Sequence, residues 1–95
     1  MLNQVVCMGR LYNKPSDYCC IEGEYKVFEI KVPRPEPSTR EDIIRCLTTE
    51  NIAKNLAEYA RVDDIIAIRG SLRWVNDRVH VLVDKLTYLA SKGGE

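Results

Sequence analysis

The residues of this chain best suited to chemistry are cationic and aromatic side chains on expected strands or in one exposed loop. Single-stranded nucleic acid is held by cations that follow the phosphates and by flat side chains that stack on the bases. Alternation along the strands directs Arg45 and Lys31 outward, with Ile43 and Tyr25 on the same faces. The full set of candidate contact residues is Trp74, Arg45, Arg73, Arg34, Lys31, Tyr25, Ile43 and Arg40. The sequence predicts that these side chains line one groove.

These candidates also have plainer interpretations. Arg34, Arg40 and Arg78 are typical of solvated surface when each is taken alone. Trp74 also fits a contact within a hairpin or between subunits, and Phe28 fits the core.

Enzyme activity is not indicated by the sequence. There is no glycine-rich phosphate loop and no nucleophile with a base at recognisable spacing. The only histidine, His80, alternates with Val79 and Val81, as an exposed strand residue would. Asp63 and Asp64 are adjacent on an expected turn, where both are solvated. We therefore expect a binding protein and no catalysis.

The four cysteines contain no C-x-x-C pair. Cys7 and Cys46 lie in apolar, strand-like runs, where a free thiol packs as a small hydrophobe. Cys19, Cys20 and His80 offer metal-binding atoms but too few ligands at a recognised spacing. We expect neither a metal site nor a cofactor.

Composition limits the class of protein. The 95 residues are 45% hydrophobic, which suffices for one modest core and a single domain. Fourteen basic residues balance fourteen acidic ones, so any binding of a polyanion must come from a local groove. There is no apolar run near 18 residues and no charged-then-apolar leader, so we expect no membrane span, no secretory signal and a cytoplasmic location.

The chain is organised around the stretch from Asp64 to Trp74, in which Ile66, Ile68 and Leu72 recur at every second position. This pattern predicts a long β-strand, bent at Gly70. A helix is expected just before it, over residues 51–60, with Thr48 or Thr49 as its cap. Asn76 and Asp77 then form a tight turn to a strand that carries Val79, Val81 and Val83.

The first half of the chain is rich in expected strands. Residues 2–12 place Val5, Cys7 and Leu11 on one face and Val6 and Met8 on the other, with Gly9 as a bulge or corner. Residues 18–21 and 25–32 form a hairpin around residues 22–24, and residues 42–47 form the next strand. Both faces of the first strand are apolar, so one is expected to face the interior and the other a partner subunit.

The order of elements is strand, hairpin, strand, helix, hairpin. It is that of the OB-fold, a mainly β, five-stranded Greek-key barrel with one short helix between strands 3 and 4. We expect a single domain over residues 1–90 and a flexible end over residues 91–95.

Three stretches resemble the family of bacterial single-stranded DNA-binding proteins. Residues 2–11 read Leu-Asn-Gln-Val-Val-Cys-Met-Gly-Arg-Leu, which is similar to the family's Asn-x-Val-x-Leu-Val-Gly-Arg-Leu. Residues 52–59 resemble its helix, and residues 66–72 resemble its Val-x-Val-x-Gly-x-Leu strand. The family's aromatic platforms correspond here to Ile43 and Thr49, whereas Trp74 lies near its aromatic position in the last hairpin.

The resemblance implies sequence-nonspecific binding of single-stranded DNA during replication, recombination or repair. It also implies a homodimer or homotetramer formed through the first strand, with replication or repair proteins as further partners. The alternative is an OB-fold protein-protein interaction module, such as a primosome-type accessory, with weak or no nucleic-acid binding.

Overall fold

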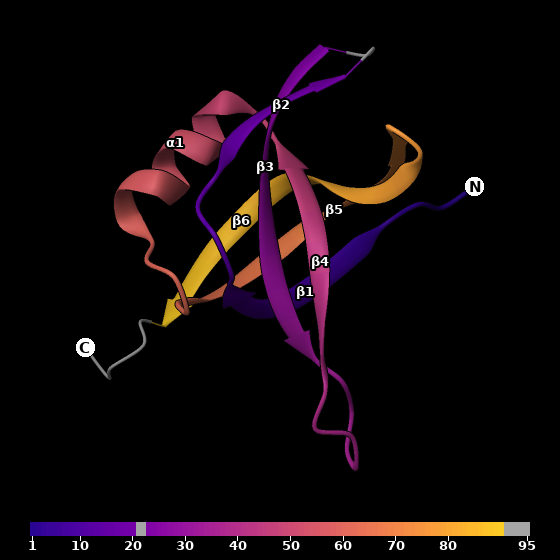
Figure 1. The fold of residues 1–95 in the computed structure, drawn as a ribbon, viewed down its shortest axis with the longest axis vertical. Coiled ribbons are helices and arrows are strands. Elements are labelled where there is room, and N and C mark those ends of the chain that lie inside the picture. Colours follow the sequence, from indigo (N-terminus) through magenta and orange to yellow (C-terminus); the bar gives the residue numbers. More distant parts are fainter. Residues whose placement is uncertain (21–22, 91–95) are drawn as a thin grey trace.

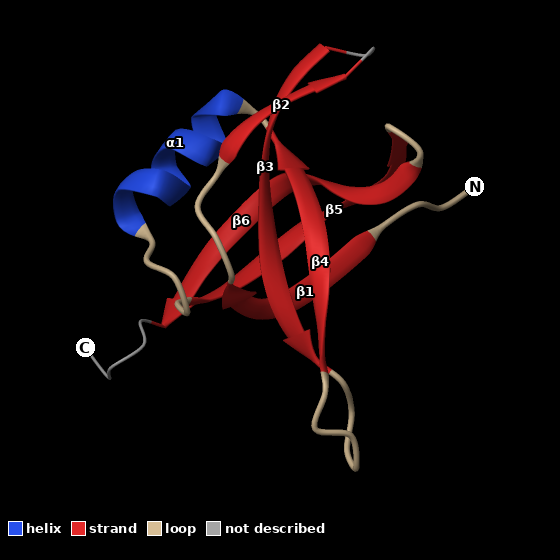
Figure 2. Cartoon of the chain, in the orientation of Figure 1, coloured by secondary structure: helices blue, strands red, loops and turns tan. Residues whose placement is uncertain are grey.

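The computed structural model describes residues 1–20 and 23–90, which form seven elements of secondary structure (Figures 1 and 2). These are β1 (Val5–Leu11), β2 (Ser16–Cys20), β3 (Gly23–Pro33), β4 (Glu41–Thr48), α1 (Glu50–Tyr59), β5 (Ile65–Val75) and β6 (Arg78–Ala90). Two expectations, the hairpin turn at Glu22 and the flexible end over residues 91–95, lie outside the described residues.

The strands close into a ring in the order β1, β5, β6, β4, β3 and back to β1. All of these pairings are antiparallel except β4 with β6, which is parallel and joins only Cys46 to Val81 and Leu47 to Leu82. Strand β2 stands outside the ring and pairs with β3 alone. The predicted five-stranded OB barrel is confirmed, with α1 between its third and fourth strands.

Alternating side chains fill the barrel interior. Phe28, Ile30, Ile66 and Ile68 face inward as the period-two pattern predicted, and none is more than 1% exposed. Leu56 of helix α1 and Ala60, the C-cap residue that follows it, join the same cluster, because these positions lie one turn apart on the buried side. The core is therefore shared by the barrel and the helix that packs against it.

Helix α1 begins after Thr49, which occupies the N-cap position, but its hydroxyl makes no capping hydrogen bond. Thr49 is therefore the cap residue that the sequence predicted, without a hydrogen bond from its side chain. Glu50 in the first turn still interacts favourably with the helix dipole. The helix ends where the backbone N–H of Ala60 donates to the carbonyl of Leu56.

The bends and the tight turn of the barrel occur at the positions that the sequence predicted. A register shift separates Arg69 from Gly70 in the pairing of β5 with β6, and a Cβ on Gly70 would collide with the carbonyl oxygen of Leu82. Asn76 and Asp77 both have positive φ, 51° and 62°, as a two-residue type I′ hairpin requires. Gly9 lies at a corner, next to Arg10 and Leu11, which pair with β3.

Cys46 is fully buried, and burial raises the pKa of its thiol to about 12. Cys7 is half-buried and packs against the core cluster. Both thiols therefore behave as small hydrophobes, as expected. None of the helices described, over residues 1–20 and 23–90, is long and apolar enough to cross a membrane.

Candidate nucleic-acid interface

A groove of about 480 Å³ lies along the free edge of β4 and is called the β4 groove below. It exists because β4 joins β6 at only two residue pairs, so no described strand pairs with that edge of β4 before Cys46. Most of its walls are apolar. Its lining residues come from β1, β4, β5 and β6 and are Val5, Cys7, Ile43, Ile44, Arg45, Leu72, Arg78, Val79, His80 and Val81.

Large apolar side chains are exposed along this groove. Ile43, Leu72 and Val79 are each 44–54% exposed, although they come from three different strands. Trp74 is 67% exposed and pairs across the hairpin with Val79. Alternation puts Trp74 on the same face of β5 as Leu72, so the indole extends the apolar surface beyond the groove. An exposed aromatic ring such as the indole suits the faces of unpaired bases.

Arg45 is one of two arginines in the wall of the groove, with Arg78, and its side chain is 28% exposed. Its Nη1 lies 3.7 Å from Oε2 of Glu29, and its Nε donates to Nε2 of His80 at 3.2 Å. The guanidinium carbon lies 5.5 Å from the centre of the Tyr18 ring. Arg45 therefore reaches an open surface, as predicted, but its guanidinium is held by neighbours from β2, β3 and β6.

His80 corrects one expectation, because it is only 1% exposed whereas Val79 beside it is 54% exposed. Its Nδ1 lies 3.3 Å from the carbonyl oxygen of Arg78, and its ring centre lies 5.2 Å from that of Tyr18. Burial lowers the pKa of His80, and the nearby charges of Arg45 and Arg78 act in the same direction, against the hydrogen bond to the Arg78 carbonyl. The ring is therefore neutral at pH 7, with its proton on Nδ1.

Two other predicted cations are paired with carboxylates. Nζ of Lys31 lies 3.4 Å from Oδ1 of Asp63 and 5.5 Å from the centre of the Tyr12 ring. Arg34 donates from Nε and Nη2 to Oδ1 of Asp42, at 3.0 and 2.8 Å. This contact lowers the pKa of the Asp42 carboxyl and raises that of Arg34. A phosphate would have to compete with Asp63 and Asp42 for these cations.

The remaining predicted residues fall in different places. Arg34 and Arg40 belong to the β3–β4 connection, which Figure 1 shows at the far end of the molecule from the β5–β6 turn. Arg73 pairs with His80 and lies on the face of β5 opposite to Trp74. The structure thus brings Ile43 and Arg45 together in the β4 groove with Trp74 beside them, and leaves Arg34 and Arg40 apart.

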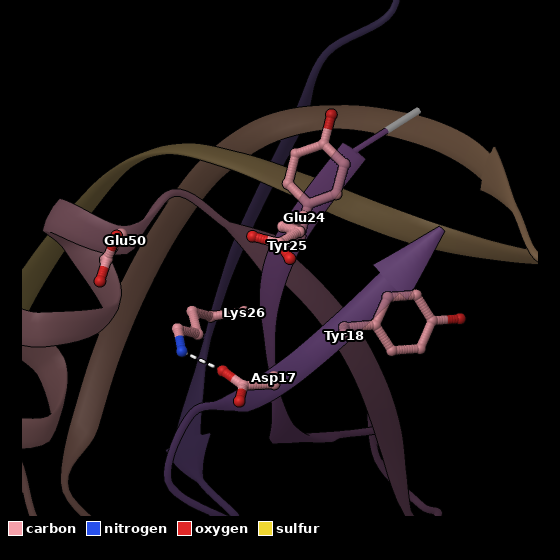
Figure 3. A pocket seen from close by; sticks show the side chains of 6 residues that line it. All are labelled: Asp17, Tyr18, Glu24, Tyr25, Lys26 and Glu50. Carbon is pink, nitrogen blue, oxygen red and sulfur yellow. Dashed lines mark hydrogen bonds and ion pairs between the residues drawn. The ribbon is translucent and has the colours of Figure 1, made fainter. Parts of the chain in front are cut away.

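Tyr25 lines a separate hollow of about 260 Å³ beside β2 and the start of α1 (Figure 3). The other residues around this acidic hollow are Asp17, Tyr18, Glu24, Lys26 and Glu50. Lys26 forms an ion pair with Asp17, which leaves an excess of carboxylates. A phosphate backbone is disfavoured there by like-charge repulsion.

Sequence reasoning missed Tyr18 and His80 as neighbours of Arg45. Glu29 links Arg45 to Asn13, whose Nδ2 donates to Oε1 of Glu29 at 2.7 Å. The register of β3 and β4 contains one usable signal, because Glu29 and Arg45 are direct cross-strand partners of opposite charge. No comparable signal exists for Tyr18 and His80, whose strands do not pair.

The closed ring, its strand order and the helix between β4 and β5 define the class of protein as OB-fold. No family model matches the chain. It is 29% identical, over an alignment of 109 positions, to a single-stranded DNA-binding protein of Oceanobacillus iheyensis, covering all of this chain and 68% of that one. This similarity confirms the resemblance that the sequence indicated.

Solved structures of other proteins have the same fold. A mitochondrial single-stranded DNA-binding protein of S. cerevisiae superposes with a TM-score of 0.76 at 13% identity, over 96% of this chain and 99% of that one. The dimeric N-terminal domain of PriB from Thermoanaerobacter tencongensis gives 0.74 at 18% identity, over 94% and 98%. At these identities the likeness establishes the OB-fold.

Proposed function

We propose that this protein binds single-stranded DNA without sequence preference, in the β4 groove and on the adjoining surface of Trp74. One observation carries the proposal: a mainly apolar groove with an exposed indole beside it and a guanidinium in its wall. Such surfaces hold single strands because every base has a flat face, so stacking tolerates any sequence. The names of its relative from Oceanobacillus iheyensis and its neighbour from S. cerevisiae support this function.

The charge distribution favours binding through bases over binding through phosphates. Basic and acidic residues are equal in number, and Lys31 and Arg34 are paired with carboxylates. A protein that neutralises few phosphates releases few counterions and loses little affinity in salt. We therefore expect a modest salt dependence, to which Arg45 contributes.

The biological role that follows is protection or organisation of single strands during replication, recombination or repair. Nothing in this role requires catalysis, and we expect a cytoplasmic binding protein without enzyme activity. Replication or repair proteins are its expected further partners.

The first strand is proposed as the contact between subunits of a homodimer or homotetramer. Val6 and Met8 point outward from β1 and are 71% and 59% exposed. Among the described residues, β1 from Val5 to Met8 pairs on one side only, with β5, so its other edge there offers backbone groups for pairing. The similar PriB domain is described as dimeric, which supports this proposal.

A second candidate function is an OB-fold protein-protein interaction module with weak or no nucleic-acid binding. Ile43 and Thr49 stand where the resembling family has aromatic residues, and the net charge is zero. Arg45 and the exposed Trp74 favour the first function.

Titration with polythymidine separates the two functions, because Trp74 is the only tryptophan and its fluorescence reports on the site. Single-strand binding predicts quenching of this fluorescence, with affinity that falls as salt is raised from 50 to 300 mM. Unchanged fluorescence, together with no retention of labelled polythymidine on a filter, would remove the first function and leave the interaction module.

A further inference from the structure

Tyr18, Arg45 and His80 meet at one place although they belong to strands far apart in the sequence, and they are called the Arg45 cluster below. The guanidinium lies over the Tyr18 ring at 5.5 Å, and the Tyr18 and His80 rings are 5.2 Å apart at 54° to each other. Strand β2, which carries Tyr18, is outside the barrel ring. Strand β2 therefore adds to this site an aromatic side chain that the five strands of the barrel do not supply.

The cluster faces the place where a single strand is proposed to lie. Arg45 and His80 both line the β4 groove, and Arg45 also lines a second hollow of about 250 Å³ with Asn13, Lys14 and Glu29 among its walls. Figure 3 shows the Tyr18 side chain directed away from Lys26 and Glu50 of the acidic hollow. A base that leaves the β4 groove over its wall would therefore meet Arg45 next.

The plane of the guanidinium is fixed by its partners. Glu29 holds Nη1 and His80 accepts from Nε, while Glu29 is itself held by the Nδ2 group of Asn13 and donates its backbone N–H to Asn13 Oδ1 at 2.8 Å. A guanidinium is flat, remains charged and stacks on rings, whereas the ammonium group of a lysine has no plane that could stack. Fixing this plane before binding lowers the entropy lost when a base stacks on it.

We propose that the Arg45 cluster is a stacking site for one unpaired nucleobase. The inference rests on the proposed binding of single-stranded DNA and specifies its chemistry. Arg45 offers its flat guanidinium to the base, Tyr18 supports it from behind, and Glu29 and His80 are positioning residues. The ligand is a base of any type, because stacking on a guanidinium does not depend on base edges.

The test compares Arg45→Lys with the unchanged protein on oligothymidine and on an oligomer of the same length without bases. Lysine keeps the charge but removes the plane, so the stacking site predicts about a tenfold loss of affinity for oligothymidine and an unchanged salt dependence. On the abasic oligomer the two proteins should bind equally. An equal loss on both ligands would show that Arg45 contacts phosphate, and would overturn the inference.

Tyr18→Leu provides a second variant if Arg45→Lys unfolds, and it should show the same base-dependent loss. Arg69→Lys is the matched control, because Arg69 lies on β5 in an exposed ion pair with Asp84, and neither residue lines the β4 groove. If neither variant of the cluster changes the affinity for oligothymidine while the unchanged protein binds it, the inference fails and the proposed function stands. If the unchanged protein binds no single strand, the proposed function itself fails.

Discussion

Nε of Arg45 on β4 donates to Nε2 of His80 on β6 at 3.2 Å, so a cation is held by a buried imidazole that must be neutral to accept the bond. Protonation of His80 would remove the acceptor and place two positive charges in contact. The structure therefore couples the proton occupancy of one histidine to the geometry of the β4 groove.

This coupling predicts that stability falls with mild acid. The pKa of His80 is lowered in the folded protein, chiefly by burial, so the unfolded chain binds a proton near pH 6.5 before the folded protein does. The free energy of unfolding should be constant above about pH 7 and decrease as the pH falls from about 6.5 to the native pKa of His80. Thermal unfolding at pH 7.5, 6.5 and 5.5 measures it.

His80→Gln is the control, because its amide oxygen can still accept from Arg45 but does not titrate. Since His80 is the only histidine, this variant should have nearly the same melting temperature across that range. An equally steep fall in both proteins would assign the effect to carboxylates.

Trp74 is predicted to contribute to binding and little to folding. Its side chain is 67% exposed, so Trp74→Ala should change the free energy of unfolding by no more than about 0.5 kcal/mol. Stacking of one base on an aromatic ring is worth about 1 to 3 kcal/mol, which corresponds to about a 5- to 150-fold loss of affinity for oligothymidine. Fluorescence anisotropy of a labelled oligomer measures the loss.

Trp74→Phe keeps a ring and should recover most of the affinity. A melting temperature that drops sharply in Trp74→Ala would instead support the alternative that the indole makes a structural contact within the hairpin or between subunits.

The barrel was predictable because apolar residues recur at every second position of its strands. Ile66 and Ile68 on β5 and Phe28 and Ile30 on β3 are buried for the reason that the sequence indicates: alternate side chains share one face of a strand. The tight turn at Asn76 and Asp77 was equally predictable, because asparagine and aspartate are among the few residues other than glycine that adopt positive φ readily.

The surroundings of His80 could not be predicted in the same way. Alternation tells which face of a strand a residue occupies, but it does not tell whether another strand covers that face. Tyr18 on β2 and Arg45 on β4 cover the imidazole of His80. His80 is therefore buried, although it alternates with Val79 and Val81. Likewise, the pairing of Arg34 with Asp42 depends on how the proline-containing loop returns, which local sequence does not determine.

Gly70 is predicted to be required for closure of the barrel. A Cβ at this position would lie far inside contact distance of the Leu82 carbonyl oxygen, and a backbone atom cannot move aside without breaking the pairing of β5 with β6. Overpacking costs typically about 1 to 3 kcal/mol, so Gly70→Ala should lower the free energy of unfolding by at least that amount. Urea denaturation followed by circular dichroism measures the change, and Ser71→Ala, at the next position of β5, should have a much smaller effect.

The proposed subunit contact predicts that charge on the outward face of β1 separates the subunits. Val6 and Met8 are exposed in the single chain, and a large exposed apolar patch on a strand is typical of a contact with another protein. Burying a carboxylate without a partner is costly, so a double variant with Val6→Glu and Met8→Glu should be monomeric at micromolar concentration. Light scattering after gel filtration measures the mass. Val62→Glu replaces an exposed apolar residue on the turn before β5, which is hydrogen-bonded to the Leu11 end of β1 and not to Val6 or Met8, and should leave the oligomer intact. The prediction is contradicted if the unchanged protein is already a monomer, or if the double variant has the same mass as the unchanged protein.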